Sequence, residues 1–300
     1  RKQRLKDNPK DMIDKSMCSL IKVPNTRINK TLKDSLEEQA NDWIKGFRKV
    51  PEAFVSLLQR NPIKELNKLN HKCKESNDQL PKLLTSYLKD NPKVTLAIQG
   101  PPGSGKTTTT AHLIRELVEA GKRVAVSSNS NNAINNLLIK TWQIFDQNKL
   151  QVDIVKAGKR PKDKIAFKDT LIKGVLVKQI TDDMKVIGGT AWNLQSELLE
   201  NKFDVLIIDE ASQLSLFHLL VMARCSDSIL LVGDQKQLGQ PIKAKHPGQA
   251  NLSCLDYLIN GENVIPNDKG FFLDISYRME PSITELVSKM SYDGKLKACK

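Results

Sequence analysis

Gly100-Pro-Pro-Gly-Ser-Gly-Lys-Thr107 is the stretch that decides the fold of this 300-residue chain. It matches the pattern GxxxxGK[ST], with an apolar run before it and a helical segment, Thr108 to Ala120, after it. A glycine-rich loop in this position can wrap its backbone N–H groups around a phosphate chain, and the following helix turns its positive N-terminal dipole toward the same anion. We expect Lys106 to contact the β- and γ-phosphates of ATP and Thr107 to be a ligand of Mg²⁺. The nucleotide-binding residues are then Gly100, Pro101, Pro102, Gly103, Ser104, Gly105, Lys106, Thr107 and Thr108.

Short apolar runs separated by helical segments surround this loop. The runs are Val94–Ile98, Arg123–Val126, Val186–Ile187, Val205–Ile208, Ile229–Val232 and Phe271–Leu273. Runs of this length bounded by turn residues are typical of buried parallel strands. They predict an α/β fold with a doubly wound parallel sheet.

The first 92 residues have a different pattern. Apolar residues recur there at helical spacing, as in Leu32, Leu36, Ala40, Trp43 and Ile44. Prolines interrupt the pattern at Pro24, Pro51, Pro62 and Pro81. We therefore expect a helical N-terminal region, 1–92, made of several short helices.

Two adjacent carboxylates, Asp209 and Glu210, follow the apolar run Val205–Ile208. Ligands of open α/β sheets bind at the carboxyl ends of the strands. We expect Asp209 to be an outer Mg²⁺ ligand and Glu210 to be the base that orients or deprotonates an attacking water. The structural alternative is a helix N-cap.

A third polar turn, Gly233-Asp-Gln-Lys-Gln237, follows the run Ile229–Val232. The neutral amide of Gln237 can hydrogen-bond the γ-phosphate or the attacking water and can respond to the loss of phosphate. Alone, the stretch would be an ordinary turn. As the third strand end of one predicted sheet, it belongs to the same site.

Composition restricts the class of protein. The chain has 47 Lys and Arg against 34 Asp and Glu, a formal charge of +13, concentrated in residues 1–99 (+9) and 156–178 (+6). This excess fits a polyanionic partner, although a lysine-rich solvated surface stays open because only 10 of the cations are arginines. No run approaches the ~20 apolar residues of a membrane span, so we expect a cytoplasmic protein with no membrane partner. The five cysteines are scattered, which argues against a disulfide framework or a zinc site.

The ordered stretches GPPGSGKT, DEASQ, GDQKQLGQP and LDISYRM together resemble superfamily 1 DNA and RNA helicases of the subgroup thought to move 5′→3′. Three more stretches, at 188–192, 246–248 and 292–296, are similar to the helicase half of bacterial fusions of a RecB-like nuclease to a helicase. The resemblance implies that Arg278 reaches the γ-phosphate as an internal arginine finger. The structural alternative for Arg278 is a surface arginine after a strand.

The resemblance also implies a domain organisation. It gives a RecA-like P-loop ATPase domain over 93–285, with a basic helical insert within 130–185, and the truncated start of a second RecA-like domain over 286–300. The rest of that second domain and a nuclease domain are expected elsewhere in the same polypeptide, because residues 1–92 show no carboxylate arrangement that would hold two metal ions. For the adenine-reading glutamine usual before the P-loop, the candidates are Gln79 and Gln99.

The same family places strand-end residues on nucleic acid. Short neutral donors in the stretch 128–131 can hold phosphate and sugar oxygens without distinguishing bases, and Trp192 can stack on a base. The implied contacts are Ser128, Asn129, Ser130, Asn131, Thr190 and Trp192. The structural alternatives are a turn or helix cap for the Ser/Asn cluster and a core position for Trp192.

These inferences predict a helicase motor that hydrolyses ATP with Mg²⁺ while moving on single-stranded nucleic acid, DNA rather than RNA, in DNA repair or processing. Two other functions stay open: a nucleotide-dependent module that clamps nucleic acid without unwinding it, and a P-loop kinase, against which the Asp209-Glu210 pair and Gln237 argue. We also expect the basic segment 156–178 to lie beside the strand path. Charge reversal at Lys159, Arg160 and Lys162 should then weaken binding and flatten its salt dependence.

Overall fold

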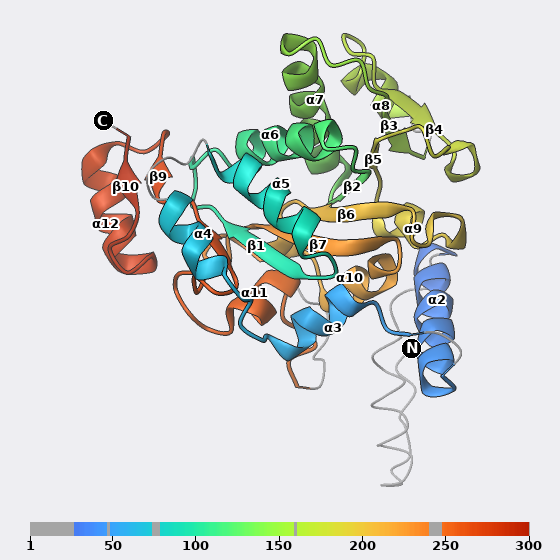
Figure 1. Ribbon diagram of the computed structural model, residues 1–300, viewed down its shortest axis with the longest axis horizontal. Helices are drawn as coiled ribbons and strands as arrows, with labels where there is room; N and C mark the ends of the chain where they lie inside the picture. Colours follow the sequence, from blue (N-terminus) through green and yellow to red (C-terminus); the bar gives the residue numbers. More distant parts are fainter. Residues whose placement is uncertain (1–26, 47–48, 74–78, 159–160, 240–247, 300) are drawn as a thin grey trace, which may run out of the picture.

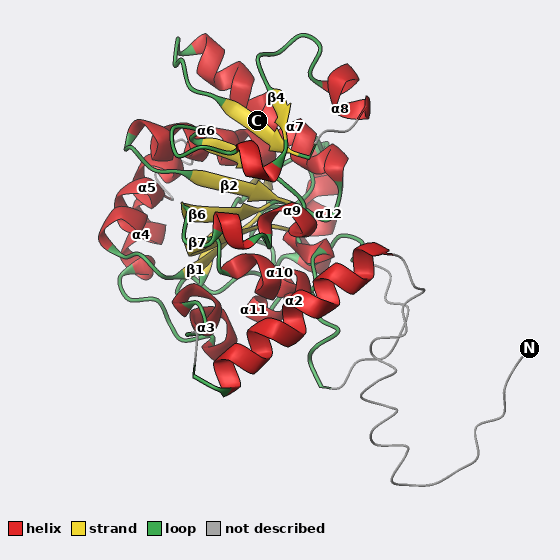
Figure 2. Cartoon of the chain, turned by 90° about the vertical axis from the view of Figure 1, so that its right-hand side faces the viewer, coloured by secondary structure: helices red, strands yellow, loops and turns green. Residues whose placement is uncertain are grey.

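The computed structural model describes residues 27–46, 49–73, 79–158, 161–239 and 248–299. Within them, an eight-stranded sheet of order β4-β3-β5-β2-β6-β7-β1-β8 lies between two layers of helices (Figures 1 and 2). Its strands are β1 (Thr95–Gln99), β2 (Val124–Ser127), β3 (Ile154–Ala157), β4 (Lys173–Val175), β5 (Val186–Gly188), β6 (Phe203–Ile208), β7 (Ser226–Gly233) and β8 (Gly270–Phe272). Every pairing in it is parallel, which confirms the predicted doubly wound α/β fold.

Alternate residues of the strands supply two hydrophobic cores. Leu96 and Ile98 of β1 face one core, whereas Ala97 faces the other, because successive side chains of a strand point to opposite faces. The first core is covered by α4 (Leu66–Cys73), α5 (Leu80–Asp90), α6 (Lys106–Glu119) and α7 (Asn131–Gln147). The second is covered by α2 (Arg27–Ile44), α3 (Glu52–Gln59), α9 (Ala191–Leu194), α10 (Leu216–Ala223) and α11 (Cys254–Ile259). Among the described helices, none is long and apolar enough to cross a membrane.

The short helices expected before the sheet are α2 to α5. Pro51 is the N-cap of α3, and Pro81 lies in the first turn of α5. A proline is tolerated at the first turn because its missing N–H would have no intrahelical acceptor there. The two prolines therefore mark where helices begin, as the interruption of the apolar pattern indicates.

The range 130–185 holds more than a helical insert. Besides α7, α8 (Pro161–Ala166) and the 3-10 turn Val177–Gln179, it contributes β3 and β4 to one edge of the sheet. The sequence did not indicate these strands, since Lys156 interrupts the apolar run of β3, and β4, Lys173-Gly174-Val175, is not an apolar run. Lys156 is only 1% exposed, and its Nζ donates to Asn131 Oδ1 at 2.8 Å, which satisfies a charge inside a buried strand.

A second, smaller parallel sheet follows β8. It pairs β9 (Ile275–Ser276) with β10 (Lys297–Ala298), and α12 (Pro281–Ser291) connects the two strands (Figure 1, red). The change from the first sheet to the second falls between Phe272 and Ile275. This β9-α12-β10 unit carries Arg278 in the loop between β9 and α12.

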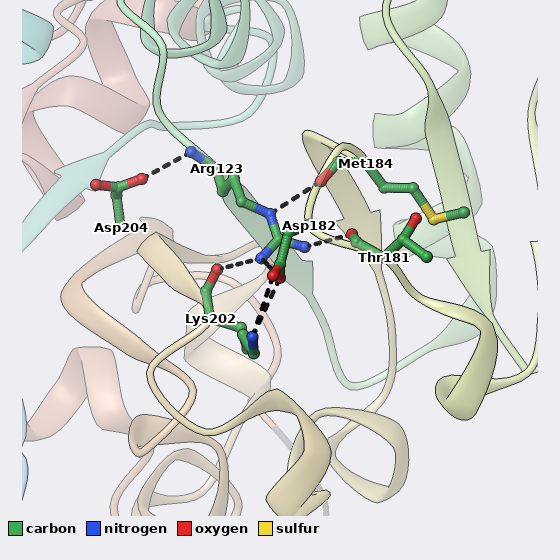
Figure 3. A network of polar contacts seen from close by, with 6 residues as sticks. All are labelled: Arg123, Thr181, Asp182, Met184, Lys202 and Asp204. Atoms are coloured by element: carbon green, nitrogen blue, oxygen red, sulfur yellow. Dashed lines mark hydrogen bonds and ion pairs between the residues drawn. The ribbon is translucent and has the colours of Figure 1, made fainter.

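The amino ends of the strands are held together by Arg123 (Figure 3). Its backbone N–H donates to Asp204 Oδ2 at 2.8 Å, and its guanidinium donates to three carbonyl oxygens and one carboxylate at 2.8 to 3.1 Å. Those guanidinium partners are Thr181, Asp182, Met184 and Lys202. Because this network fastens the starts of β2, β5 and β6, far from their carboxyl ends, its role is structural.

Candidate nucleotide and nucleic-acid site

The carboxyl ends of four neighbouring strands meet at one edge of the sheet. Gln99 of β1 pairs with Gly233 of β7, and Ser127 of β2 pairs with Ile208 of β6. Backbone hydrogen bonds continue past the strand ends, from Gly100 N to Gly233 O at 2.9 Å and from Asp209 N to Ser127 O at 2.8 Å. The structure therefore brings the predicted phosphate loop, the carboxylate pair and the glutamine turn side by side.

The glycine-rich loop is tightly wound onto α6. Gly103 and Gly105 have φ of +75° and +81°, which glycine adopts without steric cost, and Gly105 is the N-cap of α6. Lys106 Nζ donates to Gly100 O at 2.7 Å, so the ammonium lies within the loop. The buried hydroxyl of Ser104 has no partner. A helix N-terminus, an ammonium and an unpaired hydroxyl at one loop form a cradle suited to phosphate.

The carboxylate pair splits into one buried and one half-buried group. Asp209 is 5% exposed and accepts from the backbone N–H of Glu210 at 3.1 Å. Burial, and then the charge of Glu210, raise the pKa of the Asp209 carboxyl to about 6, and that N–H bond and the Lys106 ammonium oppose the rise. Glu210 lies in the left-handed region with φ of 53°. A glutamate at positive φ is uncommon.

The Thr107 hydroxyl and the Asp209 carboxylate are the hard oxygen donors that Mg²⁺ prefers. A buried carboxylate whose pKa is raised is also one that a cation stabilises, so these two residues fit a magnesium ion. Among the described residues, no group of three or more His, Cys, Asp and Glu side chains could hold a metal. Mg²⁺ usually keeps waters and phosphate oxygens as its other ligands.

The glutamine turn is organised by a buried aspartate. Asp234 is 0% exposed, and its Oδ2 accepts from Gln237 Nε2 at 2.9 Å and from the Tyr292 hydroxyl at 2.7 Å. Since a carboxylate can only accept, the amide nitrogen of Gln237 must face Asp234. The amide oxygen of Gln237 is then the atom left to accept a hydrogen bond from another group.

Arg278 is anchored directly over the phosphate loop. Tyr277 N donates to Gly103 O at 2.9 Å, and Ser276 Oγ donates to Pro102 O at 3.1 Å. A Cβ placed on Gly103 would overlap the Cβ of Arg278. The exposed Arg278 side chain thus begins at the loop, although 172 residues separate it from Lys106 in the chain.

The Ser/Asn cluster after β2 is part of a helix start. Ser130 is the N-cap of α7 and accepts from Ala133 N at 3.1 Å, while Asn131 accepts from Lys156. Ser128 is buried with an unpartnered hydroxyl, and Asn129 is exposed. The helix-cap alternative describes Ser130 correctly, and Asn129 and Ser130 are the exposed members of the cluster.

Thr190 and Trp192 lie at the next strand end, after β5. Thr190 Oγ1 donates to Asn193 Oδ1 at 2.9 Å within the first turn of α9, and Thr190 is buried. Trp192 is 36% exposed and packs against His218, with ring centroids 5.8 Å apart and an angle of 51°. Trp192 therefore presents part of its ring to solvent instead of filling the core.

The two glutamines that were candidates for reading adenine lie in different surroundings. The side-chain amide of Gln99 donates to Asn263 O at 3.0 Å and accepts from Ile265 N at 2.6 Å, so this fully buried glutamine is a structural residue. Gln79 is exposed at the start of α5. Lys159, Arg160, the side chain of Lys162, and the stretch 246–247 lie outside the described residues.

The family described as "AAA domain" matches residues 82–250, which is more than half of the chain. The chain belongs to the AAA domain family. The "DNA replication ATP-dependent helicase/nuclease DNA2" of Gallus gallus is 28% identical over 300 residues, 93% of this chain and 28% of the chicken protein. The protein with the same description from Saccharomyces cerevisiae is 30% identical over 213 residues, 67% of this chain and 13% of that one. This AAA domain chain thus spans less than a third of the length of each of these relatives.

Two solved structures are also similar to this AAA domain chain. One is the complex of Arterivirus nonstructural protein 10 (helicase) with DNA, at 14% identity and a TM-score of 0.44, covering 68% of this chain and 41% of that one. The other is the PRRSV helicase, at 14% identity and a TM-score of 0.41, covering 72% and 37%. The narrower resemblance to bacterial nuclease–helicase fusions stays a prediction.

Two residues of the AAA domain site were not found from the sequence. In the sequence, Lys156 stands out only as part of the basic segment 156–178, and Tyr292 only as part of the helicase-like stretch 292–296. Lys156 would have been found from a strand predicted over 154–157, since a lysine inside a buried strand must have a partner. No local signal marks Tyr292, because its partner Asp234 is 58 residues away.

Proposed function

We propose that this AAA domain is the ATP-hydrolysing motor of a superfamily 1 helicase that moves on single-stranded DNA. The observation that carries the proposal is the position of Arg278, whose backbone neighbours are hydrogen-bonded to the loop that holds Lys106. A phosphate loop, a carboxylate pair, a glutamine turn and an arginine around one point are the groups that phosphoryl transfer to water requires. The similarity to DNA2 helicase/nucleases supports a role in DNA replication or repair.

The residues divide the chemistry among them. Lys106 and Arg278 stabilise negative charge that develops on the transferred phosphoryl group, and Glu210 orients or deprotonates the attacking water. Gln237 presents its amide oxygen as a further acceptor for a water proton, because its nitrogen is held by Asp234. Thr107 and Asp209 would hold Mg²⁺, which would neutralise part of the negative charge of the phosphate groups.

DNA contacts belong to the adjoining strand ends. Asn129 and Trp192 expose a polar group and a ring at the ends of β2 and β5, next to the carboxylates at the end of β6. Because β2 lies between β5 and β6, a DNA strand bound at the ends of β2 and β5 contacts loops that are hydrogen-bonded to the phosphate site. We therefore assign single-strand binding to this face, with Trp192 stacking on a base.

Lys106→Ala, made in the protein of full natural length, tests the proposal. We expect a loss of ATP hydrolysis of more than about 100-fold, since the ammonium acts on transition-state charge, with single-strand affinity changed by less than about threefold. Lys89→Ala, an exposed lysine at the end of α5, is the matched control and should keep the parent rate. Normal turnover by Lys106→Ala would exclude the assignment.

Strand displacement separates the helicase from a clamp. On a tailed duplex, the parent protein should release the displaced strand in an ATP-dependent reaction. ATP hydrolysis that single strands stimulate, without displacement, would favour the binding module instead. Products phosphorylated in the absence of nucleic acid would favour a kinase.

A further inference from the structure

The aspartate of the glutamine turn links two separate parts of the fold. Asp234 follows β7 of the eight-stranded sheet, and Tyr292 ends α12 of the smaller unit. Their side chains meet at 2.7 Å, and Asp234 is 0% and Tyr292 2% exposed. A hydrogen bond between a carboxylate and a hydroxyl at this burial is worth more than one in water, because few other partners can replace either group.

Tyr292 is fixed on its other side by packing. Its ring lies 5.8 Å from that of Phe272, which belongs to β8, and it forms a small core with Val264 and Leu296. Burial, and then the neighbouring Asp234, raise the pKa of the Tyr292 phenol. The hydroxyl therefore stays protonated at neutral pH and remains a donor to Asp234.

A second connection joins the same two segments. Asn263 Nδ2 donates to Asp293 Oδ1 at 2.8 Å, and Lys236 Nζ donates to Asn263 Oδ1 at 2.5 Å. Gln235 Nε2 donates to Asn263 O at 2.9 Å. The turn 234–237 is thus bonded to the residues that end α12 both directly and through Asn263.

Both ends of α12 are consequently attached to the nucleotide site. At the start of α12, the residues before Arg278 bond the phosphate loop, and at its end Tyr292 bonds the aspartate that holds Gln237. A rigid helix fastened at two points cannot shift against the sheet without disturbing at least one of them. The orientation of Gln237 and the position of α12 are therefore mechanically linked.

We propose that Tyr292 is a positioning residue for Gln237, holding Asp234 so that the Gln237 amide oxygen faces the phosphate site and α12 follows the state of that site. The assignment of Gln237 to the phosphate site rests on the proposed function. The link between Tyr292 and the turn 234–237 does not, because it follows from the hydrogen bonds alone.

Hydrogen exchange in the nucleotide-free protein tests the link without any activity. Tyr292→Phe keeps the ring in its core and removes the hydroxyl. The amides of Lys236 and Gln237, which donate to Asp234 Oδ1 at 3.2 Å and Asp234 O at 3.2 Å, should exchange about tenfold faster. The control is Tyr87→Phe, which removes the hydroxyl of another buried tyrosine, bonded to Lys64 O at 3.2 Å, and should leave those amides unchanged.

Kinetics test the consequence for Gln237. In the protein of full natural length, Tyr292→Phe should lower kcat for ATP about tenfold and leave KM within about twofold, because a mispositioned acceptor affects the transition state and not nucleotide binding. In a Gln237→Ala background, the same change should have no further effect on kcat. Asn263→Ala, which cuts the indirect connection, should show a smaller decrease in kcat and covers the case in which Tyr292→Phe folds poorly.

The outcomes are distinguishable. Unchanged exchange at 236–237 in Tyr292→Phe overturns the link, whether or not the protein hydrolyses ATP. An additive loss of kcat in the double variant overturns the positioning role, since it would show that Tyr292 acts independently of Gln237. A parent protein that exchanges as expected but has no ATPase activity would instead overturn the proposed function.

Discussion

Replacing Asp209 with asparagine is expected to stabilise the nucleotide-free protein at neutral pH. The Asp209 carboxyl is buried beside Glu210, which raises its pKa from 3.8 to about 6. The folded state therefore holds a proton more tightly than the unfolded state, and stability is lost as the pH rises from below 4 to above 6. Asparagine has no charge to bury and can accept the same hydrogen bond from the backbone N–H of Glu210.

The magnitude follows from the two pKa values. A tenfold change in proton affinity is worth about 1.4 kcal/mol, so a rise from 3.8 to about 6 costs about 3 kcal/mol at pH 7.5. At pH 5, where the folded state is largely protonated and the unfolded state is not, the cost is about half as large. For a chain of this size, 3 kcal/mol corresponds to a rise in Tm on the order of 5 °C.

Urea denaturation of the parent and of Asp209→Asn at pH 7.5 and pH 5 measures this effect. The variant should gain about 3 kcal/mol at pH 7.5 and about half of that at pH 5, while losing Mg²⁺-dependent nucleotide hydrolysis. Asp227→Asn, an exposed aspartate in β7, is the control and should change stability by less than about 0.5 kcal/mol at either pH. A variant no more stable than the parent at pH 7.5 would refute the claim that burial of the Asp209 charge destabilises the nucleotide-free protein.

Substitutions at three other positions give further predictions. Gly103→Ala places a Cβ against Arg278 at a φ of +75°, so it should lower the free energy of unfolding, measured by thermal denaturation, by on the order of 1 to 3 kcal/mol and lower ATPase activity more than about tenfold. An active, equally stable variant would contradict the close approach of Gly103 and Arg278. Arg123→Ala removes the network at the strand starts and should lower the free energy of unfolding in urea by about 2 to 4 kcal/mol, whereas Arg123→Lys should recover only part of that stability. A loss below about 1 kcal/mol in Arg123→Ala would show that the network is redundant. Trp192→Ala should weaken single-strand DNA binding, measured by fluorescence anisotropy, by about tenfold or more, and Trp192→Phe should weaken it less. Equal affinity of the parent and both variants would show that Trp192 does not contact the DNA.

Much of the sheet was predictable from short apolar runs. β1, β2, β5, β6, β7 and β8 were all indicated, because a fully buried strand leaves a continuous run of apolar residues in any sequence. β3 and β4 were not, since Lys156 breaks one run, and β4, Lys173-Gly174-Val175, is partly exposed and has no apolar run. A partly exposed strand, or a strand that contains a buried charge with a partner, leaves no such run.

The phosphate loop was predictable for a different reason. Its chemistry depends on glycines at fixed spacing and on one lysine within eight residues, so the information is local. The role of Arg278, by contrast, was predicted only through a family resemblance, because nothing in the residues beside it in the sequence indicates that they form hydrogen bonds with the loop at Gly103.

The sequence alone was sufficient for features that act over a few residues: which apolar runs are buried strands, where the phosphate loop lies, and which polar groups follow those strands. The tertiary structure was needed for everything that depends on register and burial, such as the raised pKa of Asp209 and the bond between Asp234 and Tyr292. The physical reason is that a parallel sheet aligns strand ends whose residues are tens to hundreds of positions apart. Electrostatic and hydrogen-bond energies are then set by those neighbours in space, and not by neighbours in the chain.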